Sequence, residues 1–289
     1  MELTGWDAAA ILAKAITYAT TFGAAGAILF LNYSETLLRT AQRRRIHRLI
    51  ALLLIAAALA SAAKVLMLAG SMSEDFAGMF DGSYAGMILR AGEGRAIGIR
   101  MVGLFVGAAL FLRQPLYRTA ALGALIAAGS FAAMGHVHAL EPNTAATLLS
   151  VLHLGCAAFW LGALWPLLHV ARDGDDAQTA AVAARFGKIA MSVVAALIVA
   201  GMLLLYRMLG SVSELWTGAY GRMLSLKLLF VAALLGAAAL NKLRLTPRLA
   251  AGDARAGRHL RRSIRAEMVL GGLILLVTAA LTTLAGPSD

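Results

Sequence analysis

Long runs of apolar residues, separated by short polar or charged segments, set the pattern of this 289-residue chain. A transmembrane α-helix needs about 20 mainly apolar residues, and eight runs are of that order. They lie at residues 8–32, 49–70, 96–113, 119–139, 146–169, 187–208, 222–242 and 264–285. The pattern predicts an all-α fold, a polytopic membrane bundle of about eight transmembrane helices that forms a single transmembrane domain over residues 1–289.

Lysine and arginine indicate the orientation of the predicted helices, because loops on the cytoplasmic side are enriched in these residues. One set of inter-run segments carries most of them: Arg39, Arg43, Arg44, Arg45, Arg48, Arg113, Arg118, Arg172, Arg185, Lys188, Lys242, Arg244, Arg248, Arg255, Arg258, Arg261, Arg262 and Arg265. The opposite set carries only Arg90, Arg95, Arg207 and Arg222. This alternation is consistent with eight spans, and it predicts a bacterial inner-membrane protein with both termini in the periplasm.

Composition supports the membrane prediction. Hydrophobic residues make up 60% of the chain and charged residues 14%, whereas soluble domains are usually about 45–50% apolar and about 25% charged. The net charge of +11 raises the question of nucleic-acid binding. Since the basic residues lie in short loops between apolar runs, membrane topology explains them better, and the predicted surroundings are a lipid bilayer without nucleic acid.

The cysteine content and the N-terminal residues are also informative. Cys156 is the only cysteine, which excludes an intramolecular disulfide and a zinc site built from several cysteines. The first residues, Met1 to Asp7, are acidic and lack the basic segment of a signal peptide, so we expect a retained first helix.

Three of the six histidines gather on the predicted outer side. His136 and His138 end the fourth run, and His153 lies about 8 residues into the fifth, roughly 12 Å deep at ~1.5 Å per residue. Ionisable residues at membrane depth are costly and usually functional. The other three histidines, His47, His169 and His259, lie on the basic side and are interpreted as ordinary interfacial residues.

Helix geometry limits how these histidines combine. Residues two apart on an α-helix point about 200° apart, so His136 and His138 share a site only if the helix ends there, as the following Glu141-Pro142 permits. His136 and His153 belong to consecutive predicted helices and differ in depth by about 6 Å at the same rise. They are the best candidate metal pair, with His138 third. The alternative is that these histidines only form hydrogen bonds between helices.

Methionine gives a second signal on the same side. Nine methionines fall in outer loops or outer halves of the runs: Met67, Met72, Met79, Met87, Met101, Met134, Met202, Met208 and Met223. Thioethers select Cu(I), and imidazole suits copper in either oxidation state, so this pattern predicts a copper ion as Cu(I) or Cu(II). The further candidate ligands are Met67, Met101, Met134, Cys156 and Glu141. Methionine and a lone cysteine are also common as apolar filler, which is the competing interpretation.

Charged residues inside the apolar runs are the remaining candidates for a transport path or for a structural role. Four of them lie toward the outer half: Lys14, Lys64, Arg100 and Lys227. They either extend to the interface, pair with acidic residues of the outer loop 71–95, or form a cationic lining. Glu267, near the inner end of the last run, either caps an exit path or pairs with a basic neighbour such as Arg244 or Arg265.

No enzyme signature is present in the sequence. It contains no Walker-type phosphate loop, no nucleophile elbow and no HExxH motif, so we expect neither an enzyme nor an ATP-driven pump.

An ordered set of short motifs in the second half of the chain resembles a known family. The motifs are Gly135-His136, Leu152-His153-Leu154, Phe159 to Leu164, Arg185-Phe186-Gly187, the Gly201 region, Thr217 to Lys227, Asn241-Lys242 with Pro247, and Arg261 to Glu267. In this order they resemble the CopD family of bacterial copper-resistance proteins of the inner membrane, most closely over residues 120–285. This chain departs from the family pattern at Cys156, where a small residue is usual, and at Ala163, which replaces a glycine.

The resemblance implies a protein that takes copper from the periplasm and moves it across the inner membrane, in copper transport, homeostasis or resistance. It implies His136 and His153, and less surely His138, as the metal ligands. Its expected partner is a periplasmic CopC-like copper-binding protein on a separate chain, since no such domain is fused here.

Two alternative functions stay open. His136 and His153 would also serve as the two axial ligands of a b-type haem in a membrane redox protein. The second alternative is a copper sensor or assembly partner that binds copper without transporting it.

Overall fold

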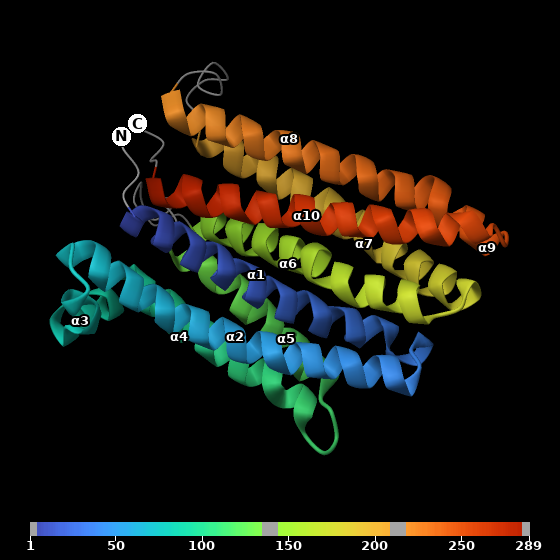
Figure 1. Ribbon diagram of the computed structural model, residues 1–289, viewed down its shortest axis with the longest axis horizontal. Helices are drawn as coiled ribbons and strands as arrows, with labels where there is room; N and C mark the ends of the chain where they lie inside the picture. The colour runs from blue at the N-terminus through green and yellow to red at the C-terminus, as the bar shows by residue number, and fades with distance from the viewer. Residues whose placement is uncertain (1–4, 135–143, 209–217, 285–289) are drawn as a thin grey trace.

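The computed structural model describes residues 5–134, 144–208 and 218–284, and within these ranges it is helical without any strand (Figure 1). This confirms the predicted all-α class. The long helices are α1 (Gly5–Ser34), α2 (Thr40–Ser73), α4 (Gly92–Gly107), α6 (Thr144–Asp173), α7 (Asp176–Met208), α8 (Gly218–Leu240) and α10 (Ala254–Leu284). With the turns that continue them, these 7 helices are long and apolar enough to cross a membrane.

Shorter elements connect the long helices. They are η1 (Glu35–Leu37), η2 (Ala77–Phe80), α3 (Gly82–Arg90), η3 (Ala108–Phe111), α5 (Tyr117–Gly129), η4 (Ser130–Met134), η7 (Asn241–Leu245) and α9 (Thr246–Ala250). All the η elements named here are 3-10 turns except η7, which is a π-helical turn. The predicted fourth span, 119–139, corresponds to α5 and η4, whose described part ends at Met134. The count of eight spans therefore stays a prediction.

Helices α1 and α6 occupy the middle of the bundle. Helix α1 packs against α2, α5, α6 and α10, while α6 also packs against α7 and α10. Figure 1 shows α2, α4 and α5 on one side of this pair and α7, α8 and α10 on the other. The start of α1 and the end of α10 lie together. A hydrogen bond joins them, in which the Lys14 ammonium donates to the carbonyl of Thr282 at 2.9 Å. We name this end of the bundle the outer end, following the charge alternation, and the opposite end the inner end.

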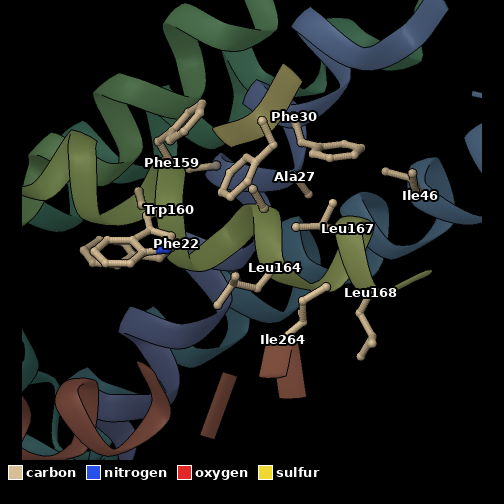
Figure 2. Close-up of a cluster of buried hydrophobic side chains, with 14 of the residues drawn as sticks. Phe22, Ala27, Phe30, Ile46, Phe159, Trp160, Leu164, Leu167, Leu168 and Ile264 are labelled. Carbon is tan, nitrogen blue, oxygen red and sulfur yellow. The ribbon is translucent and has the colours of Figure 1, made fainter. Parts of the chain in front are cut away.

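The core is built where the central helices meet α2 and α10. Phe22 and Phe30 of α1 lie among Phe159, Leu164 and other residues of α6, as Figure 2 shows. Ile46 of α2 and Ile264 of α10, both with 0% exposure, complete the cluster. This single buried cluster includes residues from both the first and the last helix, so it joins the two sides of the bundle.

Two glycines let α1 and α6 approach each other closely. A Cβ atom built on Gly26 would collide with the backbone of Ala158 and Gly162, and one built on Gly162 would collide with the backbone of Phe22 and Gly26. Small residues at helix contacts permit such backbone approach in membrane proteins, where dispersion rather than the hydrophobic effect drives association. The α1–α6 contact therefore depends on the absence of side chains at these positions.

The inner end is tied together by exposed ion pairs. Arg39 and Arg45, at the start of α2, contact the carboxylates of Asp175 and Asp173 at 2.6 and 2.7 Å. These carboxylates lie in the turn between α6 and α7. Basic residues thus surround this turn, as the predicted orientation requires of a cytoplasmic surface.

The outer loop 71–95 folds into the end of α2, then η2, α3 and the start of α4. Asp81 caps α3 by accepting hydrogen bonds from the Ser83 hydroxyl at 2.7 Å and the Ser83 amide at 2.8 Å. These hydrogen bonds hold the pKa of Asp81 below its usual value.

The α1–α6 contact yields the first prediction. Gly162→Ala places a methyl group against the backbone of α1, so we expect it to lower the free energy of unfolding by about 1–3 kcal/mol, the usual cost of overpacking. Thermal unfolding in detergent measures the effect. The matched control is Gly236→Ala on α8, where an added Cβ meets nothing within 4 Å. Equal unfolding temperatures for the two variants would contradict the prediction.

Candidate functional site

His153 is the predicted metal ligand whose surroundings the structure describes. It lies on α6, and its imidazole packs against α7, where a Cβ built on Gly201 would lie 3.2 Å from Cε1 and 3.3 Å from Nδ1 of the ring. Gly201 thus provides the space that the imidazole occupies. The sequence pattern singled out the Gly201 region, and this contact gives that glycine a physical role.

A backbone carbonyl orients the His153 ring. The Nδ1 atom lies 3.3 Å from the carbonyl oxygen of Leu197. Because a carbonyl oxygen only accepts, Nδ1 carries the proton in this contact and Nε2 keeps the lone pair of a neutral imidazole. Metal-binding histidines usually have their other ring nitrogen held in this way. The arrangement therefore suits His153 to bind a metal through Nε2.

Lys227 lies close to this ring. It belongs to α8 and acts electrostatically on His153. A nearby ammonium group opposes the binding of a metal cation, so copper at Nε2 would need further electron-rich ligands. Lys227, predicted as a path or structural residue, is thus placed by the structure beside the predicted metal ligand.

Cys156 is buried on α6, one turn from His153, and its thiol is free. Over residues 5–134, 144–208 and 218–284 there is no group of three or more His, Cys, Asp or Glu that could hold a metal ion. These two residues therefore do not complete a metal site within the described ranges, and the role of Cys156 as a ligand stays a prediction.

The other outer candidates lie outside what the structure describes. His136, His138 and Glu141 fall in 135–143, outside the described residues. Met134 ends η4, and its side chain is not described. The predicted pairing of His136 with His153 therefore stays a prediction.

Met67 and Met101 lie on helices other than the one that His153 contacts. Met101 of α4 packs against Ala57, Leu104 and Ala127, a position where methionine fills an apolar core. Met67 is half-buried on α2. The described contacts of the His153 ring are instead with α7, so the structure does not bring these two methionines to it.

Lys64 pairs with an acidic residue of the outer loop. Its ammonium lies 2.7 Å from the Glu93 carboxylate, and the two side chains are only 6% and 17% exposed. Of the three alternatives raised by the sequence, pairing with an outer-loop acid is therefore the one found for Lys64. The burial of both side chains places this ion pair between helices α2 and α4.

Arg100 is fully buried, with 0% exposure, which excludes extension to the interface for this residue. Its guanidinium donates to the hydroxyls of Ser61 at 3.0 Å and Ser130 at 3.2 Å, and it lies 3.9 Å from the ring centroid of Phe131. A cation–π contact of this kind offsets part of the cost of desolvation. Among the described residues, its Nη2 has no hydrogen-bond partner.

Several charged residues gather in the outer part of the α1–α2–α4 side. The charges of Lys64 and Glu93 act on Lys14, and the charge of Arg100 acts on Lys64. Lys14, Lys64 and Arg100 are cations of this group, and the Glu93 carboxylate lies among them.

Glu267 is the buried carboxylate of the opposite side. It lies on α10 with 2% exposure, and the Asn241 amide donates a hydrogen bond to it. Within the described ranges no ion pair includes Glu267, so pairing with Arg244 or Arg265 is not found there. The alternative raised by the sequence, an exit path, stays a prediction.

Several polar residues that hold these charges were not singled out by sequence. Ser61 precedes Lys64 by three residues, and Ser130 directly precedes Phe131. Both serines lie inside apolar runs, and a polar residue in such a run could have indicated a buried hydrogen-bond partner. Asn241, in contrast, ends an apolar run, where an amide side chain is ordinary. Its contact with Glu267 depends on packing between helices distant in sequence.

The fold and these buried groups define a multi-pass helical membrane protein. Two family models match the chain: the one described as "Copper resistance protein D-like, N-terminal domain" matches residues 5–144, and the one described as "Copper resistance protein D" matches residues 180–281. No curated protein and no solved structure matches. The chain belongs to the CopD family of copper resistance proteins. The N-terminal match extends the resemblance beyond residues 120–285, where the sequence motifs were strongest.

The buried ion pair leads to a double-variant prediction. Glu93→Gln removes the carboxylate that neutralises Lys64, and we expect a loss of roughly 3 kcal/mol in unfolding free energy, as for a broken buried pair. The double variant Glu93→Gln, Lys64→Met should lose less than the single one, because the Lys64 ammonium is then no longer buried without its partner.

Thermal unfolding of the single and double variants measures this difference. The control is Asp173→Asn, which breaks the exposed pair with Arg45 and should cost less than about 1 kcal/mol. A double variant less stable than Glu93→Gln alone would contradict the interpretation.

The packing of His153 leads to a third prediction. Gly201→Val would push the imidazole away from α7, so we expect copper content of the purified protein to fall severalfold while the fold is retained. Elemental analysis measures the copper. Gly236→Val, in open space on α8, is the control and should keep its copper. Full copper content in Gly201→Val would contradict the view that copper binding depends on the position of the His153 imidazole against α7.

Proposed function

We propose that this protein takes copper from the periplasm through His153 and passes it across the bacterial inner membrane toward the cytoplasm. In this proposal the chain crosses the membrane eight times, the fourth span being α5 with η4, and both termini lie in the periplasm. Copper is the transported ion. Membership of the copper resistance family supports copper as the metal, and the charge alternation supports this orientation of the two surfaces.

The observation that carries the proposal is the orientation of His153. Its Nδ1 is engaged by the Leu197 carbonyl, which leaves Nε2 as the ligand atom, and Gly201 keeps the ring against α7. The cationic cluster around Arg100 lies on the other side of the bundle. In this proposal a cation that enters at the outer end binds on the α6–α7–α8 side, where His153 lies.

A periplasmic partner of the CopC type would deliver the copper. His136 and His138 are the further ligands expected from sequence, and they would supply the electron density needed beside Lys227. The partner, the ligand set and the oxidation state of copper are all parts of the proposal.

The test is metal analysis of purified protein. His153→Ala with His136→Ala should lose at least about tenfold in bound copper, because two of the three proposed nitrogen ligands are removed. The control is His259→Ala, an exposed histidine near the inner end, which should keep its copper. Unchanged copper in the double variant would overturn the assignment.

Two further measurements separate the alternative functions. A Soret band in the visible spectrum of the purified protein would favour a b-type haem on the same histidines. Proteoliposomes that bind copper without taking it up would favour a sensor or assembly partner. We expect no Soret band and time-dependent copper uptake.

A further inference from the structure

A cavity of about 430 Å³ lies between α7 and α8. It follows α7 from Ala183 to Ile198, roughly 22 Å at ~1.5 Å per residue, which is most of the ~30 Å hydrocarbon thickness of a bilayer. Helix α7 packs against α6 and α9, whereas α8 packs against α10, so these two consecutive helices flank the cavity.

Along α7, the cavity begins near the level of His153 and continues toward the inner end. Ile198 lines it and directly follows Leu197, whose carbonyl holds the His153 ring. A second cavity, of about 540 Å³, shares several lining residues with the first: Ala183, Gly187, Lys242 and Thr246. This second cavity extends to Pro247 and Ala250, next to the basic inner end. Together they connect the level of His153 with the inner surface.

Acceptor atoms are in excess where the first cavity meets α10. Glu267, Asn241 and Trp160 all line it. The Asn241 amide donates a hydrogen bond to the Glu267 carboxylate. The Asn241 Oδ1 atom is buried and has no hydrogen-bond partner in the described part of the chain. A carboxylate and an unused amide oxygen thus lie side by side at the cavity wall.

No cation neutralises this carboxylate within the described ranges. Glu267 and Lys242 are the charged residues of the cavity wall, but the Lys242 ammonium donates to the Gly187 carbonyl at 3.0 Å and forms no ion pair with Glu267 there. Buried charges in proteins are normally paired or bind a metal ion. The carboxylate and the amide oxygen are therefore suited to bind a cation.

The local backbone also departs from the regular α-helix at this point. Asn241 and Lys242 belong to the π-helical turn η7, which joins α8 to α9. π-helical turns inside helices occur frequently at functional sites. Here the turn brings two consecutive polar side chains to the wall of one cavity.

We propose that Glu267 and Asn241 form a second cation site, which receives the copper ion after it leaves His153 and before it reaches the inner surface. This inference rests on the proposed function, since it takes copper to enter from the outer side. The carboxylate supplies the charge and the Asn241 oxygen a further ligand atom. Met191, on the α7 wall of the same cavity, offers a thioether, a soft donor suited to Cu(I).

The first experiment detects copper at Glu267 without measuring transport. A hydrophobic carbodiimide modifies carboxyl groups in apolar surroundings, and peptide mass spectrometry locates the modified residue. We expect Glu267 of the full-length protein to be modified without copper and at least about fivefold less with copper. Glu93, paired with Lys64, is the internal control and should not respond to copper. Modification of Glu267 that is absent without copper, or equal with and without it, overturns the second site.

The second experiment measures copper uptake by proteoliposomes. Glu267→Gln keeps the shape of the side chain and a carbonyl oxygen for the Asn241 amide, but it removes the charge. We expect it to retain copper at the outer site and to lose at least about tenfold in uptake rate, with partial recovery in Glu267→Asp. Thr246→Val, another polar residue of the same cavity, is the matched control and should transport normally. Normal uptake by Glu267→Gln overturns the second site.

The two proposals fail in different ways. Copper content that is unchanged when His153 and His136 are replaced overturns the proposed outer site, whatever happens at Glu267. Copper that protects Glu267 from modification supports the second site even if the wild-type protein shows no uptake. Unchanged thermal unfolding of Glu267→Gln excludes misfolding as the cause of its effect.

Discussion

Charged groups inside this protein must find their partners within the protein, because the hydrocarbon around it holds no water that would solvate them. This constraint accounts for the arrangement of the buried polar residues. Lys64 forms an ion pair with the Glu93 carboxylate. Arg100 donates hydrogen bonds to two serine hydroxyls and lies over the ring of Phe131. Glu267 accepts a hydrogen bond from the neutral Asn241 amide and belongs to no ion pair in the described part of the chain. The two sides of the bundle therefore accommodate their buried charges in different ways.

This difference bears on the proposed binding of copper, which is a cation. The side formed by α1, α2 and α4 holds the Lys64–Glu93 ion pair and the buried guanidinium of Arg100. The side formed by α6, α7, α8 and α10 holds an oriented imidazole, two adjoining cavities and an uncompensated carboxylate. Lys227 is the exception there, since its charge lies close to His153 and must be offset when a metal ion binds.

Much of the fold could be predicted from the sequence, because in a bilayer the length of an apolar run nearly determines a helix. The seven long helices follow from that rule, and of the run at 119–139 the structure describes α5 and η4 as far as Met134. His153 and Glu267 could be singled out by their depth alone. The role of Asn241 could not, since its contact with Glu267 joins residues 26 positions apart on different helices. The packing of Arg100 against Phe131 is likewise a property of the assembled bundle.

The glycine contact between α1 and α6 has a mechanical consequence. Backbones that touch without intervening side chains have no flexible groups that could absorb a sliding or tilting motion, so Gly26 and Gly162 fasten the two sides of the bundle at its centre. A rocking movement of one side against the other would have to break this contact. Helices α7 and α8 do not take part in this contact. Helix α7 packs against α6 and α9, whereas α8 packs against α10. We therefore expect the protein to change shape by the separation and approach of these two helices around a rigid centre, with the cavity between them widening and narrowing as they move.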